Sequence, residues 1–185
     1  YVVTLLNDYE QGDSIYDSIS QIAIGKSPQI SDENTSIPLD QIDFSALKEI
    51  NPRVVGWLQL PDTVINYPVV QHDTNEYYLS HAFDGQASNF GAIFLDYRNK
   101  TDFSDKNIII YGHRMKNGSM FGSLLEYENQ DYYRLHPYFI LYTPEENYYI
   151  EIFSAHQVLY NEDYIRTQFE SDEEFKAFVD DLQAK

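Results

Sequence analysis

Apolar residues recur at helical spacing over the first part of the chain, which predicts an amphipathic helix. Gly12 interrupts the apolar stripe, so the pattern fits either one helix or two short helices that meet near this residue. Residues 25–38 are polar and contain two prolines, which favours a linker or a loop draped over the core. The stripe consists of Val2, Leu5, Tyr9, Tyr16, Ile19 and Ala23.

From residue 40 onward the pattern changes to short apolar runs bounded by turn residues, which is typical of strands. Pro68 lies inside the second run, and because proline cannot donate a ladder hydrogen bond, it predicts an edge or a bulge there. Further short helices are expected over residues 75–82, after Ser119, and after Ser171, which begins a capping box. The strand candidates are residues 54–60, 64–70, 92–95, 108–111, 138–142 and 148–158.

These elements predict a mostly β domain with peripheral helices, an α+β fold arranged as a mixed antiparallel barrel or sandwich. We expect residues 1–39 to form an N-terminal helical extension with its linker, and residues 40–185 to form the barrel domain. The 17 tyrosines and 11 phenylalanines support this reading, because aromatic rings suit a pleated, half-buried surface.

Charge narrows the range of partners. The net charge of −18 would repel a phosphate backbone and an anionic membrane surface, so nucleic acid and polybasic membrane contact are not expected. No run of the sequence is long and apolar enough for a membrane span, and no signal segment precedes the first helix. Because the chain opens in mid-pattern without a methionine, we expect an excised ectodomain.

Several kinds of chemistry find no support in the sequence. It contains no cysteine, so it offers no disulfide, cysteine–zinc site or thiolate nucleophile. None of its five histidines pairs with another at the spacing of a zinc helix, and no glycine-rich phosphate loop occurs. We therefore expect neither a metal nor a cofactor.

His113 is the strongest catalytic candidate. It follows the apolar run 108–111 and Gly112, and it precedes a polar turn. A strand holds a side chain rigidly and a following loop leaves space beside it, so this placement suits a catalytic group. The alternative is a histidine that caps the strand end by hydrogen bonds. Ser119 is a weaker candidate nucleophile, because helix capping explains it and no G-x-S-x-G elbow surrounds it.

An ordered series of motifs runs through most of the chain: NPRVVGWL (51–58), INYPVVQ (65–71), YYL (77–79), GAIFLDYRN (91–99), NIIIYGH (107–113), SMF (119–121), IFSA (152–155) and DYIRT (163–167). On this series the chain resembles the class B sortases, the cell-wall transpeptidases and thiol hydrolases of Gram-positive bacteria. The resemblance implies an eight-stranded barrel with an N-terminal helical extension. It also implies location on the extracellular face of the membrane, anchored by a preceding N-terminal segment.

The resemblance further implies a reaction. A cysteine attacks a sorting-signal peptide after its threonine and forms a thioester, which a peptidoglycan cross-bridge amine or another amine acceptor resolves. His113 matches the catalytic histidine, which favours the thiolate and protonates the leaving amine. A late arginine would stabilise the oxyanion. The residues matched to the substrate groove are Asn75, Leu79, Tyr111, Tyr160, Tyr164 and Ile165.

Each groove residue also has a structural reading, since Leu79 and Ile165 fit an ordinary core and Tyr160 an ordinary surface. One departure from the family is large. The Thr-Leu-x-Thr-Cys strand and the arginine strand would both lie beyond Lys185, and Arg166 belongs to a different loop and is no substitute. We therefore expect a barrel without its last two strands and an inactive chain. Disorder in a longer protein, cleavage and a natural pseudoenzyme remain open as reasons.

Two functions of other classes stay open beside the enzyme. An extracellular structural or adhesive β-domain, such as a pilin-like module, shares the aromatic strands, the acidic surface and the lack of cysteine. A non-catalytic regulator would bind sorting signals through the same groove. A downstream cysteine and arginine would support the enzyme, whereas a stop codon would support the binder.

Overall fold

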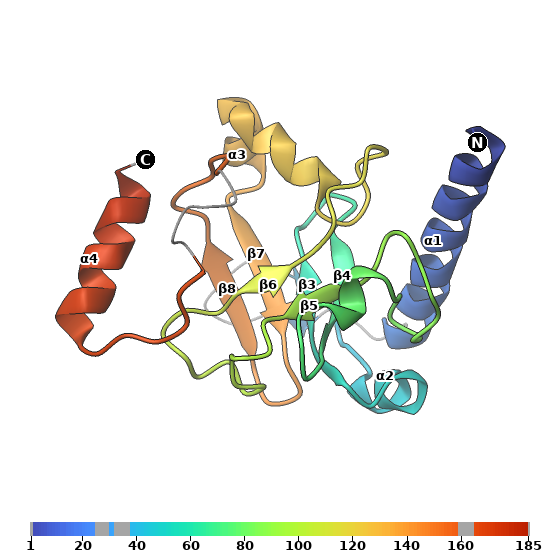
Figure 1. Ribbon diagram of the computed structural model, residues 1–185, viewed down its shortest axis with the longest axis horizontal. Helices are drawn as coiled ribbons and strands as arrows, with labels where there is room; N and C mark the ends of the chain where they lie inside the picture. The colour runs from blue at the N-terminus through green and yellow to red at the C-terminus, as the bar shows by residue number, and fades with distance from the viewer. Residues whose placement is uncertain (1, 25–29, 32–37, 159–164, 185) are drawn as a thin grey trace.

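The computed structural model describes residues 2–24, 30–31, 38–158 and 165–184. Within these ranges the chain forms one mixed six-stranded sheet in the order β6-β5-β4-β3-β7-β8. The sheet curls into a half-barrel with helices around it (Figure 1). The strands are β3 (Val54–Gln59), β4 (Asn66–Gln71), β5 (Ile93–Leu95), β6 (Ile110–Tyr111), β7 (Tyr138–Tyr142) and β8 (Asn147–Glu151).

All six strand runs expected from the sequence are therefore present, and the mostly β fold with peripheral helices is confirmed. Neighbouring strands are antiparallel except β4 and β5, which run parallel. The strand expected over 148–158 is shorter than predicted, since β8 ends at Glu151. Two short strands lie within the expected extension and linker: β1 (Ile30–Ser31) pairs antiparallel with β2 (Pro38–Leu39).

The edge predicted at Pro68 holds at that residue only, because there β4 is paired with β3 and not yet with β5. β4 lies inside the sheet between β3 and β5, and Pro68 pairs with Trp57 of β3. The parallel ladder to β5 begins only at Val69. Pro68 therefore has no partner on the β5 side, and its missing N–H interrupts no hydrogen bond to β5. The bulge lies in β3 instead, where the register shifts between Val54 and Gly56.

The core is built from the inner residues of the sheet and from the first helix. The helix α1 (Val2–Ala23) is continuous, so the two-helix alternative does not hold. Its residues Tyr16, Ile19 and Ala23 are buried in the same hydrophobic cluster as the strands. Fully buried members of the cluster include Trp57, Leu60, Ile65, Val69, Ile93, Leu95 and Ile140.

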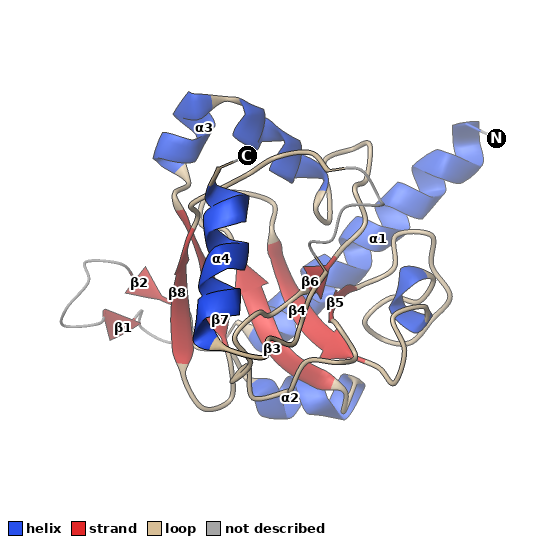
Figure 2. Ribbon diagram, turned by 60° about the vertical axis from the view of Figure 1, so that its left-hand side comes forward, coloured by secondary structure: helices blue, strands red, loops and turns tan. Residues whose placement is uncertain are grey.

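The remaining helices surround the sheet. In Figure 1, α1 and α4 (Asp172–Gln183) lie on opposite sides of the molecule, with α4 on the β8 side. Figure 2 shows the same arrangement after a 60° turn, with α2 (Phe44–Ile50) below the sheet. The others are the short 3-10 helices η1 (Tyr77–Leu79) and η2 (Gly122–Glu128) and the helix α3 (Gln130–Leu135).

The loop after β5 is held in place by two side-chain amides. The Nε2 of Gln71 donates to the backbone oxygens of Asp96 and Asn99, at 2.8 and 2.7 Å. The buried Asn99 accepts a hydrogen bond from the backbone N–H of Ile109, at 2.9 Å. Residues 96–99 are thereby fixed against the strand segment that leads to the candidate histidine.

Candidate active site

His113 lies two residues after β6, where its imidazole is half-buried. Its Nε2 lies 2.7 Å from the backbone oxygen of Leu79, at the end of η1. A carbonyl oxygen only accepts hydrogen bonds, so Nε2 carries a proton and donates it. The second ring nitrogen, Nδ1, is the one whose protonation sets the charge of the ring. The carbonyl therefore orients the imidazole through Nε2 and leaves Nδ1 available for proton transfer.

Gly91 lies directly behind the imidazole. Its φ of +59° belongs to the left-handed region that favours glycine. A Cβ at this position would lie 2.4 Å from the Tyr78 carbonyl oxygen and 3.0 Å from Cδ2 of His113. The close approach of the backbone to the ring thus requires glycine here.

A second cluster forms around the carboxylate of Asp96, which is fully buried at the end of β5. The Arg98 guanidinium donates to both carboxylate oxygens of Asp96, from Nε to Oδ1 and from Nη2 to Oδ2, each at 2.8 Å. The backbone N–H of Arg98 adds a third bond to the same carboxylate, at 2.9 Å. This two-point arginine–carboxylate geometry is among the stronger hydrogen-bonded arrangements in proteins.

Two of the predicted groove residues bind the same carboxylate. The Tyr111 hydroxyl donates to Oδ2 of Asp96 at 2.8 Å, and Nδ2 of Asn75 donates to it at 3.0 Å. Burial by itself raises the pKa of the Asp96 carboxyl, but the hydrogen bonds from Arg98, Tyr111 and Asn75 outweigh it and hold that pKa well below its usual range. Burial and the bond to Asp96 raise the pKa of the Tyr111 phenol, which stays protonated.

A third predicted residue joins this cluster through its backbone. Nη2 of Arg98 also lies 3.3 Å from the carbonyl oxygen of Ile165. The structure therefore brings together Asn75, Tyr111 and Ile165 around Asp96 and Arg98, and it places Leu79 against His113. The predictions for Tyr160 and Tyr164 fall outside the described residues.

Sequence reasoning missed Asp96, Arg98 and Gly91 as site residues. The signal for Asp96 was present, because it follows the apolar run 92–95 just as His113 follows the run 108–111. β5 and β6 pair antiparallel, with Phe94 opposite Tyr111 and Leu95 opposite Ile110, so Asp96 lies beside the start of β6, within reach of Tyr111, and not beside His113.

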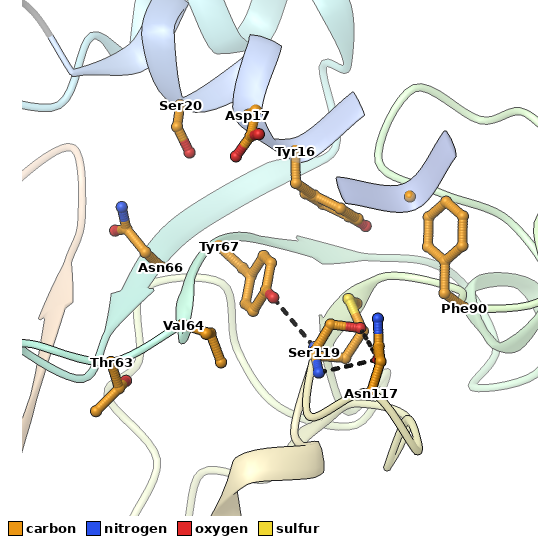
Figure 3. Close-up of a pocket in the computed structure, with 12 residues that line it drawn as sticks. Tyr16, Asp17, Ser20, Thr63, Val64, Asn66, Tyr67, Phe90, Asn117 and Ser119 are labelled. Atoms are coloured by element: carbon orange, nitrogen blue, oxygen red, sulfur yellow. Dashed lines mark hydrogen bonds between the residues drawn. The ribbon is translucent and has the colours of Figure 1, made fainter. Parts of the chain in front are cut away.

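Figure 3 shows a separate cavity of about 490 Å³ between α1, the β3–β4 turn and the segment after His113. The backbone N–H of Met120 donates to the Tyr67 hydroxyl across it, at 3.1 Å. None of the described groove residues lines this cavity. Ser119 does line it, and its hydroxyl donates to Asn117 at 2.7 Å instead of capping a helix, since η2 begins at Gly122.

Neither a metal site nor a membrane-spanning helix emerges from the part of the chain that the structure describes. No group of three or more histidine or acidic residues there could hold a metal ion. None of the described helices has the length and apolar character needed to cross a bilayer.

Known proteins share both this sequence pattern and this fold. A family model described as the Sortase domain matches residues 58–172. Sortase B of Listeria monocytogenes is 41% identical over 133 residues, which is 72% of this chain and 54% of that protein. Sortase B of Staphylococcus aureus is 36% identical over 142 residues, covering 77% of this chain and 58% of that protein.

Solved structures agree. Sortase B from Bacillus anthracis in complex with AAEK1 superposes with a TM-score of 0.85 at 37% identity, covering 97% of this chain and 82% of that one. A Staphylococcus aureus sortase B–substrate complex gives a TM-score of 0.79 at 29% identity, covering 96% and 80%. This chain belongs to the sortase family, and its relatives place it in class B. It spans little more than half the length of the curated relatives it matches.

Proposed function

We propose that this chain provides the peptide groove and the acid–base histidine of a class B sortase, a cysteine transpeptidase. The observation that carries the proposal is the imidazole of His113, half-buried and held through Nε2 by the Leu79 carbonyl. This arrangement supports a ring that exchanges a proton at Nδ1 while its orientation stays fixed. Membership in the sortase family favours this function over a structural or adhesive β-domain.

The proposed reaction has two steps. A cysteine Sγ bonds to the threonine carbonyl carbon of a sorting-signal peptide, the peptide C–N bond breaks, and imidazolium His113 protonates the leaving amine. A peptidoglycan cross-bridge amine, or another amine acceptor, then bonds to the same carbon; the C–S bond breaks and the amine proton returns to the imidazole. An arginine would stabilise the oxyanion in both steps. The site of action is the outer face of the membrane, with an N-terminal segment as anchor.

The groove residues have proposed roles in this scheme. Asn75 and Leu79 line one wall, Tyr111 lies beside the histidine, and Tyr164 and Ile165 come from the loop before α4, with Tyr160 upstream of them. Hydrogen bonds that join Asn75, Tyr111 and Ile165 to Asp96 and Arg98 support the grouping, because three separate segments of the chain meet at this pair. No cofactor takes part in the proposed reaction.

The test of this proposal depends on the cysteine nucleophile, which the 185-residue sequence lacks. Because the 185-residue sequence contains no cysteine, we expect this chain to bind a sorting-signal peptide without processing it. The experiment incubates the chain with a fluorescently labelled library of short threonine-containing peptides and an amine acceptor, and follows binding and product formation separately. Binding without product supports the proposal. Steady product formation would overturn the cysteine mechanism, and no binding of any peptide would overturn the groove.

The absence of cysteine from this sequence also favours a second candidate, a sorting-signal binder without catalysis. Both candidates predict peptide binding. Reading the coding sequence past codon 185 separates them: a cysteine strand followed by an arginine supports the enzyme, and an immediate stop codon supports the binder.

A further inference from the structure

One buried carboxylate connects three separate parts of the proposed groove. We propose that Asp96 and Arg98 form a positioning pair, which sets the geometry of Asn75, Tyr111 and Ile165 for peptide binding. The inference rests on the proposed function for the identity of the ligand. Neither residue of the pair is assigned to catalysis; both act through the residues they hold.

Asn75 shows how the pair fixes a recognition group. The side-chain oxygen of Asn75 accepts the backbone N–H of Tyr97 at 3.0 Å, while its Nδ2 donates to Asp96 at 3.0 Å. An acceptor on one side and a donor on the other allow only one orientation of the amide. An asparagine amide has two N–H donors and an oxygen with two lone pairs, so capacity for a peptide backbone remains after these two bonds.

Tyr111 and Ile165 depend on the same pair. Since the Tyr111 hydroxyl donates its only hydrogen to Asp96, its oxygen can offer a ligand only acceptor capacity. Arg98 extends the network to the segment before α4, where Nη2 donates to the Ile165 carbonyl at 3.3 Å. A guanidinium can hold a carboxylate and a carbonyl at once because its donors form a rigid, planar fork.

Burial separates this pair from an ordinary surface ion pair. The Asp96 side chain is 0% exposed and that of Arg98 is 36% exposed. Arg53 and Asp73 form a pair of the same two-point type, at 3.2 Å for both contacts, but their side chains are 43% and 78% exposed. Arg53 and Asp73 therefore provide a matched control outside the groove.

The test compares Arg98→Lys and Asp96→Asn with Arg53→Lys in the 185-residue chain. Lysine keeps the charge but loses the fork, so Arg98→Lys probes the geometry in a variant that is expected to fold. We expect both groove variants to weaken binding of the best library peptide at least tenfold, and Arg53→Lys to change it less than twofold. Equal affinities for all three variants would overturn the inference.

A second readout does not need a ligand. In NMR spectra, Asp96→Asn should move the side-chain amide signals of Asn75, because an amide at position 96 no longer requires Nδ2 to face it. Arg98→Lys should shift the carbonyl ¹³C signal of Ile165, which loses its guanidinium donor. Signals that stay in place in both variants would show that the pair does not hold Asn75 and Ile165. A lowered melting temperature with unchanged peptide affinity would show a merely stabilising role, and either result would overturn the inference.

The two readouts keep this inference distinct from the proposed function. If the unaltered chain binds no library peptide, the proposed function fails, and the NMR signals still decide whether the pair positions Asn75 and Ile165. If the chain binds peptide and the groove variants bind it equally well with unmoved signals, only the positioning role fails.

Discussion

At the scale of single residues, the Asp96 carboxylate is buried and accepts hydrogen bonds from three side chains and one backbone N–H. Removing a charge from water is costly unless its partners compensate, and here arginine, tyrosine, asparagine and a backbone N–H all donate to it. If Asn75, Tyr111 and Ile165 bind peptide as proposed, peptide binding and the stability of the chain should both respond to substitution of Asp96.

Asp96→Asn should destabilise the chain by about 2–3 kcal/mol at pH 6, less than for a fully buried pair because water reaches part of Arg98. The pKa of Asp96 is held below its unfolded value of about 3.9, so its stabilisation is complete above that pH and is lost as pH falls toward the folded pKa. Urea unfolding from pH 6 to pH 2 measures this. A difference between the two proteins that stays constant with pH would contradict the account.

Gly91→Ala tests the close approach behind His113. The positive φ alone costs about 1 kcal/mol, and the clash with the Tyr78 carbonyl should raise the loss to more than about 2 kcal/mol. Gly118→Ala is the matched control, since Gly118 also has a positive φ but has open space where its Cβ would lie. Thermal unfolding compares the two variants, and equal losses would show that the close approach to the Tyr78 carbonyl adds nothing to the cost of the positive φ.

At the scale of elements, sequence patterns predicted where the strands lie in the chain better than which strands pair with one another. Apolar runs identified all six strands of the main sheet, because inward-facing side chains must be apolar wherever a strand covers the core. Pro68 indicated an edge at one residue but not that β4 lies between β3 and β5, because the partners of a strand are set by tertiary pairing, which local sequence does not encode. The prediction that Ser119 caps a helix failed because a serine after Asn117-Gly118 suits a turn as well as a helix cap.

The first helix is joined to the site through one hydrogen bond. The buried Tyr16 hydroxyl donates to the Gly91 carbonyl at 3.0 Å, and Gly91 lies behind the His113 ring. The division at residues 39 and 40 stays a prediction about domain organisation, while Tyr16, Ile19 and Ala23 pack into the core of the barrel. The helix therefore supports the site from behind.

Tyr16→Phe should lower the free energy of unfolding by about 1–2 kcal/mol, because the buried Gly91 carbonyl loses its donor. Tyr148→Phe is the control, since the Tyr148 hydroxyl bonds to Glu146 at the exposed surface and its loss should cost less than about 0.5 kcal/mol. Chemical denaturation measures both. If Tyr16→Phe left the free energy of unfolding unchanged, the hydrogen bond to Gly91 would not contribute to the attachment of α1.

At the scale of the whole molecule, the net charge of −18 makes the folded chain repel itself. Salt screens charges separated by more than about 10 Å at 0.1 M ionic strength. Raising NaCl from 20 to 500 mM should therefore increase the melting temperature by about 2–5 °C. A fall in melting temperature over that range would mean that attractive ion pairs dominate the surface.

The site was only partly predictable from sequence. His113 could be proposed because it ends an apolar strand, and the family resemblance supplied the groove residues. The hydrogen-bond network could not be predicted, because it depends on β5 pairing with β6 and on Ile165 returning to Arg98 from 67 positions further along the chain. Such long-range contacts leave no periodic signal in the residues that make them.

The most direct test of the central claim is an NMR titration of the ¹⁵N-labelled chain with the best-binding threonine-containing peptide. The account predicts shift changes concentrated at Asn75, Leu79, Tyr111, His113 and Ile165. Changes concentrated instead around the cavity of Figure 3, at Asn66 and Ser119, would contradict it.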